Sequence, residues 1–418
     1  MRLLLDHFAH IATPKGQQAI VGTPQLLHWR DGAIMVEGDV IVDIGTSQEV
    51  HERCREPNQI LDMSGKTAIP GLVDPHTHLV FAGNRADEFN RRLHGETYVS
   101  IAQGGGGIHA TVRATRQADE SDLRRRATRV LDQMLLHGVT TIEAKSGYGL
   151  DHDTELKQLN VMRDLSASHP VDMVQTFMGA HEVPKEYKGD AMAYVAFLNR
   201  DMLPEIKRRG DVRYVDIFCE RGVFELEATR LHMQAAAEHG FGLRFHADEL
   251  VHMGGAGLAA DLGAVSADHV VYASKSDMKK MADAGVIATL LPGTSFFLRG
   301  NYADAKAFKE AGCAIALSTD FNPGSSHTCS QALMMALACM NMGMTFEETL
   351  VGTTLNAAAA IHEAHRVGSL EPGKLADIAI LDVEDAVNLV YYWGINHVCH
   401  VMKAGSWAVW QRQIRRPE

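Results

Sequence analysis

The sequence lacks paired cysteines. Its six cysteines are spread over the whole chain and no two form a Cys-x-x-Cys motif: Cys54, Cys219, Cys313, Cys329, Cys339 and Cys399. A disulfide framework is therefore not expected, because scattered single thiols are typical of a reducing compartment. We predict buried free thiols.

Long apolar segments are also absent. The run Leu3-Leu4-Leu5 ends at Asp6 and is too short for the core of a signal peptide. No other run approaches the length of a membrane span. Together with the cysteine usage, this predicts a cytoplasmic protein with no membrane partner.

Positive charge is in deficit. The chain has 40 Lys and Arg residues against 52 Asp and Glu residues, which gives a formal net charge of −12. Binding to nucleic acid requires clustered basic side chains that neutralise phosphates. We therefore expect no nucleic-acid partner and look for a small-molecule substrate instead.

The 418 residues suffice for one large domain and an accessory one, and a content of 46% hydrophobic and 22% charged residues is that of an ordinary globular protein. Both chain ends indicate β structure. Apolar runs at 33–36 and 40–44 flank a glycine-containing turn, and further strand patterns lie at 376–382 and within 398–410. We predict a small β-sandwich domain built from residues 1–68 and 363–418.

Between the chain ends, short apolar runs alternate with helical patterns, which is typical of βα units and a parallel sheet. Eight runs end in polar, chemically capable residues: 71–76, 139–145, 173–181, 214–220, 242–246, 264–269, 286–292 and 314–320. Eight such units close into a TIM-type (β/α)8 barrel of the α/β class, with its active site at the carboxyl ends of the strands. We predict this barrel over residues 69–362.

Histidines stand at the ends of these runs. His76 and His78 end the first run two residues apart, so both would point to the same side of a strand. His246 ends the fifth run and Asp320 the eighth, and the barrel would bring all four side chains to one mouth. Mixed nitrogen and oxygen ligands suit Zn²⁺ or Fe²⁺ and are poor for Mg²⁺ or Ca²⁺. We predict a metal site of His76, His78, His246 and Asp320.

Two further side chains near this site can act on water. Glu249 follows His246 by three residues, where a carboxylate can take a proton from water and later give it to a leaving nitrogen. His269 ends the sixth run and can hydrogen-bond the attacking water or a developing oxyanion. The candidate catalytic residues are Glu249, His269 and Asp320. The alternatives are a helix N-terminal carboxylate for Glu249 and a buried structural histidine for His269.

Loops after the strands offer substrate contacts. Arg85 can bind a carboxylate through two hydrogen bonds, with surface pairing to Asp87 or Glu88 as the alternative. The segment from Asn322 to Ser325 offers an amide and free backbone N–H groups. Each candidate could instead serve only the loop structure, and the full set is Arg85, Tyr148, His181, Glu249, Asn322, Gly324 and Ser325.

Five motifs resemble the imidazolonepropionase family of the amidohydrolase superfamily. The likeness runs from the first strand to residues 373–377, which is most of the chain. His-x-His marks only the superfamily, whereas KSGYG together with DFNPG is far more specific. The motifs are VDPHTHLVFAG at 73–83, EAKSGYG at 143–149, TFMGAH at 176–181, HADE at 246–249 and TDFNPG at 319–324.

The resemblance implies hydrolysis of 4-imidazolone-5-propanoate to N-formimidoyl-L-glutamate, the third step of histidine degradation, with Glu249 as general base and acid. It implies the same metal ligands and substrate residues as above, with Ser325 where relatives often carry Thr. The fourth run ends at Glu220 without the lysine that commonly bridges two metals in related barrels, so one zinc or iron ion per subunit is expected. Large barrels of this kind are often dimers, and we expect a homodimer.

Two other functions stay open from the sequence. A heterocycle deaminase of the same superfamily uses a similar metal shell and a Glu three residues after the fifth-strand His, but it releases ammonia. In a metal-binding barrel without catalysis, replacement of Glu249 would leave both the metal content and any measured rate unchanged.

Overall fold

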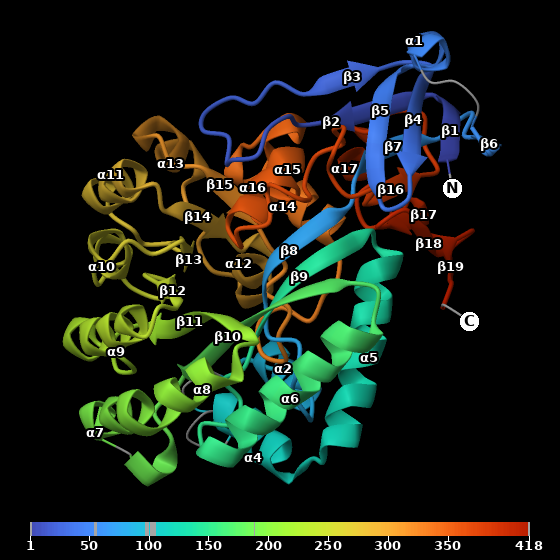
Figure 1. Ribbon diagram of the computed structural model, residues 1–418. Helices are drawn as coiled ribbons and strands as arrows, with labels where there is room; N and C mark the ends of the chain where they lie inside the picture. Colours follow the sequence, from blue (N-terminus) through green and yellow to red (C-terminus); the bar gives the residue numbers. More distant parts are fainter. Residues whose placement is uncertain (1, 54–56, 97–99, 101–105, 188, 417–418) are drawn as a thin grey trace.

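The computed structural model describes residues 2–53, 57–96, 100, 106–187 and 189–416. Its centre is a barrel of eight parallel strands that are neighbours in chain order (Figure 1). A parallel bridge between Thr77 and Phe321 brings the last strand back to the first, and the His78 N–H donates to the Phe321 carbonyl at 2.9 Å. The predicted (β/α)8 barrel is confirmed. Its strands are β8 (Leu72–Thr77), β9 (Val139–Lys145), β10 (Asp172–Ala180), β11 (Val212–Cys219), β12 (Gly242–Ala247), β13 (Ser266–His269), β14 (Ile287–Leu290) and β15 (Ile315–Leu317).

Helices cover the outside of the barrel because each presents an apolar side to the strands. In α5 (Glu120–Leu136), the residues Leu123, Ala127 and Leu131 recur every four positions and are buried. The Asp119 carboxylate accepts the Asp122 N–H at 2.7 Å and so fixes where this helix begins. The other helices after the strands are α6 (His152–Ser168), α7 (Ala191–Phe197), α8 (Leu203–Arg209), α9 (Leu226–Glu238), α10 (Gly255–Asp261), α11 (Lys275–Ala284), α12 (Pro292–Leu298), α13 (Ala305–Ala311), α14 (Gln331–Met342), α15 (Phe346–Gly352) and α16 (Leu355–Ala359). Two more, α2 (Ala86–Leu93) and α4 (Ile108–Gln117), lie in the segment between β8 and α5.

Strands from both chain ends form two sheets beside the barrel, and both termini lie on that side (Figure 1). The sheets share a buried core that includes Leu5, Ile34, Ile378 and Met402. The additional β domain built from both ends is therefore present as predicted. The first sheet has the order β5 (Val40–Thr46), β4 (Gly32–Glu37), β1 (Arg2–Phe8), β6 (Gln59–Asp62). The second has the order β19 (Gln413–Ile414), β18 (Ser406–Trp410), β17 (Val398–Lys403), β16 (Ile378–Leu381), β7 (Thr67–Pro70), β2 (His10–Thr13), β3 (Leu27–Trp29).

Our division of the chain at 68/69 and 362/363 stays a prediction. Strand β7 spans the first of these positions and pairs within the second sheet through Pro70, two residues before β8 begins. Two short helices, α1 (Ser47–Arg53) and α17 (Asn388–Tyr391), connect strands of this β structure.

The described cysteines are free thiols as predicted. Cys219, Cys313 and Cys399 are buried, whereas Cys329 and Cys339 are only partly buried, and Cys54 lies outside the described residues. Within the part of the chain that the structure describes, no helix has both the length and the apolar character to cross a membrane.

Candidate active site

The carboxyl ends of the strands surround a buried cluster of imidazoles and one carboxylate. His76 lies on β8 and His78 directly follows it, while His246 lies on β12 and Asp320 follows β15. Asp320 Oδ1 lies 3.4 Å from His76 Nε2 and 3.6 Å from His78 Nε2. His78 Nε2 in turn lies 3.3 Å from His246 Nε2. The structure therefore brings together all four predicted metal ligands.

The hydrogen bonds around this cluster leave ligand atoms for a cation. His76 Nδ1 lies 2.7 Å from an Asp268 oxygen and His246 Nδ1 lies 3.1 Å from an Asp216 oxygen. In both rings Nδ1 is thus the donor and Nε2 carries the lone pair. His76 Nε2 is buried and has no hydrogen-bond partner among the described residues. A buried unpaired lone pair beside a carboxylate is a donor set that a metal ion satisfies, so the residues fit one metal ion.

Burial also sets the charge of these ligands. It lowers the pKa of His76 and His78 well below the ordinary value, which keeps both imidazoles in the neutral form that binds metals. Burial raises the pKa of Asp320 to about 7, although the Thr294 hydroxyl donates to its Oδ2 at 2.6 Å. A cation among these groups would favour the ionised carboxylate.

Glu249 and His269 face one another beside the cluster. Glu249 Oε2 lies 3.5 Å from His269 Nε2, with side-chain exposures of 15% and 4%. Burial, with smaller contributions from Asp320 and Glu220, raises the pKa of Glu249 to about 8. The alternative of a helix-capping carboxylate fits Asp248 instead, because Asp248 accepts the backbone N–H groups of residues 253–256 where α10 begins. Glu249 does not cap this helix and lines the cavity.

A cavity of about 510 Å³ adjoins the cluster. Every predicted catalytic and substrate residue lines it, as do His78 and His246, whereas His76 is fully buried. Its other lining residues, which the sequence did not single out as site residues, are Arg92, Glu96, Ile108, Glu182, Phe218, Leu250 and Leu298.

Arg85 combines both of its expected interactions. Its Nε donates to Glu88 Oε2 at 2.8 Å, which is the predicted alternative pairing. Its Nη1 nevertheless lies against Gly324, where a Cβ would stand only 2.2 Å away. Glu88 therefore holds one edge of the guanidinium, and the absence of a side chain at Gly324 leaves room for the rest at the cavity wall.

His181 and Tyr148 also line the cavity. The His181 ring stacks on His78 with ring centroids 4.8 Å apart, and Tyr148 lies 5.1 Å from His181 by the same measure. Burial lowers the pKa of His181 to about 3, so its ring is neutral. His181 Nδ1 donates to the Gly147 carbonyl at 3.0 Å, which leaves Nε2 as a hydrogen-bond acceptor.

The loop after Asp320 differs from the expectation. We expected free backbone N–H groups, but those of Gly324 and Ser325 donate to Asn322 Oδ1 at 2.7 and 2.8 Å. Asn322 Nδ2 donates to the Asp320 carbonyl at 2.7 Å. A short side chain of this kind readily bonds to the backbone of its own turn. The prediction of free N–H groups was wrong, and Asn322 shapes the loop.

A layer of charged side chains in the interior of the barrel was not identified from the sequence. We call Glu143, Lys145, Asp216, Arg244 and Asp268 the barrel-core ionic cluster; their side chains are fully buried. A signal for them was available in the sequence. Glu143 and Lys145 alternate along β9, and Arg244 and His246 along β12, so these charges share the inward face of their strands.

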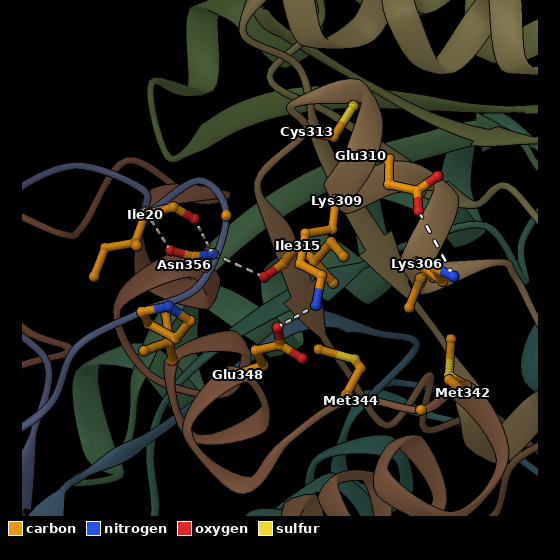
Figure 2. A pocket seen from close by; sticks show the side chains of 15 residues that line it. Ile20, Lys306, Lys309, Glu310, Cys313, Ile315, Met342, Met344, Glu348 and Asn356 are labelled. Carbon is orange, nitrogen blue, oxygen red and sulfur yellow. Dashed lines mark hydrogen bonds and ion pairs between the residues drawn. The ribbon is translucent and has the colours of Figure 1, made fainter.

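A second pocket of about 280 Å³ lies at the other ends of the strands, between the N-terminal segment and α13–α15 (Figure 2). Its polar groups pair with one another. Lys309 Nζ donates to Glu348 Oε1 at 2.6 Å, and the Asn356 amide binds both the N–H and the carbonyl of Ile20. None of the predicted site residues lines it, and it forms where the N-terminal segment packs on the barrel.

Comparisons with known proteins agree with this geometry. A family model described as the amidohydrolase family matches residues 67–408. An imidazolonepropionase of Geobacillus kaustophilus is 50% identical over 379 residues, which cover 90% of this chain and 89% of the relative. Another, of Brevibacillus brevis, is 50% identical over 409 residues, or 96% of each chain.

A crystal structure of an adenosine deaminase from Xanthomonas campestris with bound zinc has the same fold, with a TM-score of 0.71 at 17% identity over 100% of this chain and 94% of that one. At that identity it supports the barrel and its β domain alone. From the family match and the relatives at half identity, the chain belongs to the amidohydrolase family and, within it, to the imidazolonepropionases.

Proposed function

We propose that the protein hydrolyses 4-imidazolone-5-propanoate to N-formimidoyl-L-glutamate in histidine degradation. Two observations agree and carry this proposal. Imidazolonepropionases are 50% identical to the chain over at least 90% of its length, and every predicted substrate residue lines one cavity. The cavity volume of about 510 Å³ lies in the usual range for small-molecule sites.

His76, His78, His246 and Asp320 would hold one zinc or iron ion. When bound, such an ion supplies Lewis acidity that makes water nucleophilic near neutral pH. Neutral imidazoles with one carboxylate suit either metal. The adenosine deaminase neighbour of the same fold was crystallised with bound zinc.

The protein's own residues then bind substrate and move one proton. Arg85 faces the propanoate carboxylate with its Nη nitrogens, and His181 Nε2 accepts a hydrogen bond from a ring N–H. A cation in the site would favour the ionised form of Glu249. As the water oxygen attacks the ring carbonyl carbon, this carboxylate takes a proton from the water. Glu249 returns that proton to the ring nitrogen when the carbon–nitrogen bond breaks, and the product carries a new carboxylate and a formimidoyl nitrogen. His269, 3.5 Å from Glu249, hydrogen-bonds the attacking water or the developing oxyanion.

The test is the ring-opening assay on protein of measured metal content. Glu249→Gln keeps the size of the side chain but removes the proton acceptor, so kcat should fall about 10²- to 10⁴-fold. Metal content should stay unchanged, because Glu249 is not among the proposed ligands. Glu238→Gln, an exposed residue on α9, is the control and should leave kcat unchanged.

Two results would contradict this assignment. Turnover of Glu249→Gln within a few-fold of the wild type would remove the proposed proton transfer. Release of ammonia from an aminated ring, without ring opening, would favour a deaminase.

The homodimer and the cytoplasmic location stay predictions, to be checked by sedimentation and cell fractionation.

A further inference from the structure

The barrel-core ionic cluster fills the part of the barrel interior next to the proposed metal site. Bulky branched apolar side chains usually fill such interiors. Here three carboxyl groups and two basic groups share that space with no solvent exposure. Removing ions from water costs several kcal/mol each unless close partners offset it. The cluster therefore needs specific pairing, and its pairs lead to the metal-binding histidines.

The first set of contacts leads to His246. Lys145 Nζ lies 2.7 Å from Asp216 Oδ2. The other oxygen of Asp216 accepts from His246 Nδ1 at 3.1 Å and from the His246 backbone N–H at 3.2 Å. The Ile217 N–H donates to the same oxygen at 2.7 Å. Asp216 is thus fixed by its own backbone and by Lys145, and it fixes the ring of His246.

The second set leads to His76 in the same way. Arg244 Nη2 donates to Asp268 Oδ2 at 3.0 Å, and this oxygen lies 2.7 Å from His76 Nδ1. Arg244 Nη2 also donates to the Pro75 carbonyl at 2.8 Å, next to His76 in the chain. Glu143 Oε1 connects the two sets, at 2.9 Å from Lys145 Nζ and 3.8 Å from Arg244 Nε.

We propose that this cluster positions the two imidazoles for the metal: Asp216 and Asp268 hold His246 and His76 as Nδ1–H tautomers in one ring orientation, and Lys145 and Arg244 hold the carboxylates. The inference rests on the metal site of the proposed function. Carboxylates that accept from the outer nitrogen of a metal-binding histidine fix its tautomer and raise its basicity. The cluster also has three acidic side chains against two basic ones, a composition that favours a cation beside it.

The test measures metal binding rather than turnover. In Lys145→Met with Asp216→Ala, one positive and one negative charge are removed together, so the net charge of the cluster is unchanged. Glu143 loses Lys145 and keeps Arg244 at 3.8 Å, while His246 Nδ1 loses its acceptor. The Zn²⁺ dissociation constant, from competition with a chelator, should rise about 10- to 100-fold. The visible absorption band of the Co²⁺-loaded protein should change shape, because it reports the arrangement of the ligands.

Two further variants separate positioning from general loss of buried charge. Lys145→Met with Asp216→Asn keeps an oxygen for His246 Nδ1 and should fall between the wild type and the Ala form in Zn²⁺ affinity. If the Asp216→Ala form shows no thermal unfolding transition, the Zn²⁺ affinity of the Asp216→Asn form tests the proposal in its place. Lys403→Met with Asp377→Ala removes another buried pair, 2.6 Å apart, in the β domain. This control should lose thermal stability and keep its Zn²⁺ affinity and Co²⁺ band.

The outcomes are distinguishable. If the wild type binds Zn²⁺ and the folded Asp216 variants match it within twofold with an unchanged Co²⁺ band, the positioning role is wrong and the proposed function stands. An equal loss of affinity in the Lys403 control would also overturn it. A wild type that binds neither ion removes the metal site itself, and this inference with it.

Discussion

At the scale of single residues, several side chains of the site are held by unusual backbone geometry. His269, Asp320 and Asp248 have φ angles of 68°, 50° and 47°. Positive φ is uncommon outside glycine and costs of order 1–3 kcal/mol for each residue. His269 ends β13, Asp248 directly follows β12 and Asp320 lies three residues beyond β15. The turns at these positions aim His269 and Asp320 at the cavity and Asp248 at the start of α10. The sequence identified His269 and Asp320 as candidates, but no residue pattern indicates that backbone conformation.

Arg85 gives a prediction at this scale. Arg85→Ala should raise KM for imidazolonepropanoate about 10- to 100-fold and lower kcat much less. A charged hydrogen-bonded pair contributes roughly 1.5–3 kcal/mol, and a tail contact stabilises bound substrate and transition state alike. Steady-state kinetics measures this, with Arg125→Ala on the exposed side of α5 as the control. A loss confined to kcat would place Arg85 at the reacting centre instead.

Gly324→Ala is the companion variant. Its new methyl group would stand 2.2 Å from Arg85 Nη1, so the guanidinium must move although its charge is kept. We therefore expect the same rise in KM as in Arg85→Ala, and little further effect when the two substitutions are combined.

At the scale of elements, the eight strands were predictable because each is a short apolar run followed by polar residues. The run at 214–220 corresponds to β11 (Val212–Cys219) and the run at 242–246 to β12 (Gly242–Ala247). The loop at Asn322 was not predictable in detail. A side-chain amide and two backbone N–H groups satisfy one another there, and composition does not show which groups pair.

The N-terminal segment before β3 is a second feature that periodicity did not reveal. Asn356, in α16, accepts the Ile20 N–H at 2.7 Å and donates to the carbonyls of Ile20 and Ile315 at 3.0 and 2.9 Å (Figure 2). One side chain thus joins this segment to the start of β15. These contacts lie at the amino ends of the strands, the end of such barrels that serves stability rather than catalysis.

Asn356→Ala should lower the free energy of unfolding by about 2–4 kcal/mol, because it removes three hydrogen bonds to partly buried backbone groups of Ile20 and Ile315. Its kcat and KM should stay within twofold of the wild type. Denaturant unfolding and steady-state kinetics measure the two effects. Asn341→Ala, on an exposed position of α14 with one hydrogen bond to Leu337, is the control and should change stability by less than about 0.5 kcal/mol. Equal stability of the two variants would contradict the role of Asn356.

At the scale of the whole molecule, the proposed metal ligands join distant parts of the barrel. They lie at the first, fifth and eighth strands, so a metal ion bound there would connect the strand that begins the barrel to the strand that completes it. A ligand that binds only the folded protein stabilises it by about 2.7 kcal/mol at a free concentration 100 times its dissociation constant. Removal of the metal should therefore lower Tm, and added Zn²⁺ should restore it.

The size of this effect should depend on pH. In the metal-free protein the pKa of Asp320 is raised to about 7, far above its ordinary value. Between the unfolded and folded pKa values the folded state binds more protons, so the stability of the metal-free protein falls as pH rises through this window. The metal-loaded protein carries a cation in place of that proton. Burial holds the pKa of His76 and His78 well below the ordinary value, so these two rings stay neutral in the folded protein and add nothing to the difference. The gap in Tm between loaded and stripped protein should therefore widen from pH 5 to pH 8 in scanning calorimetry.

Asp320→Asn should flatten this dependence on pH. A gap in the wild type that is the same at both pH values would contradict the placement of Asp320 beside the cation.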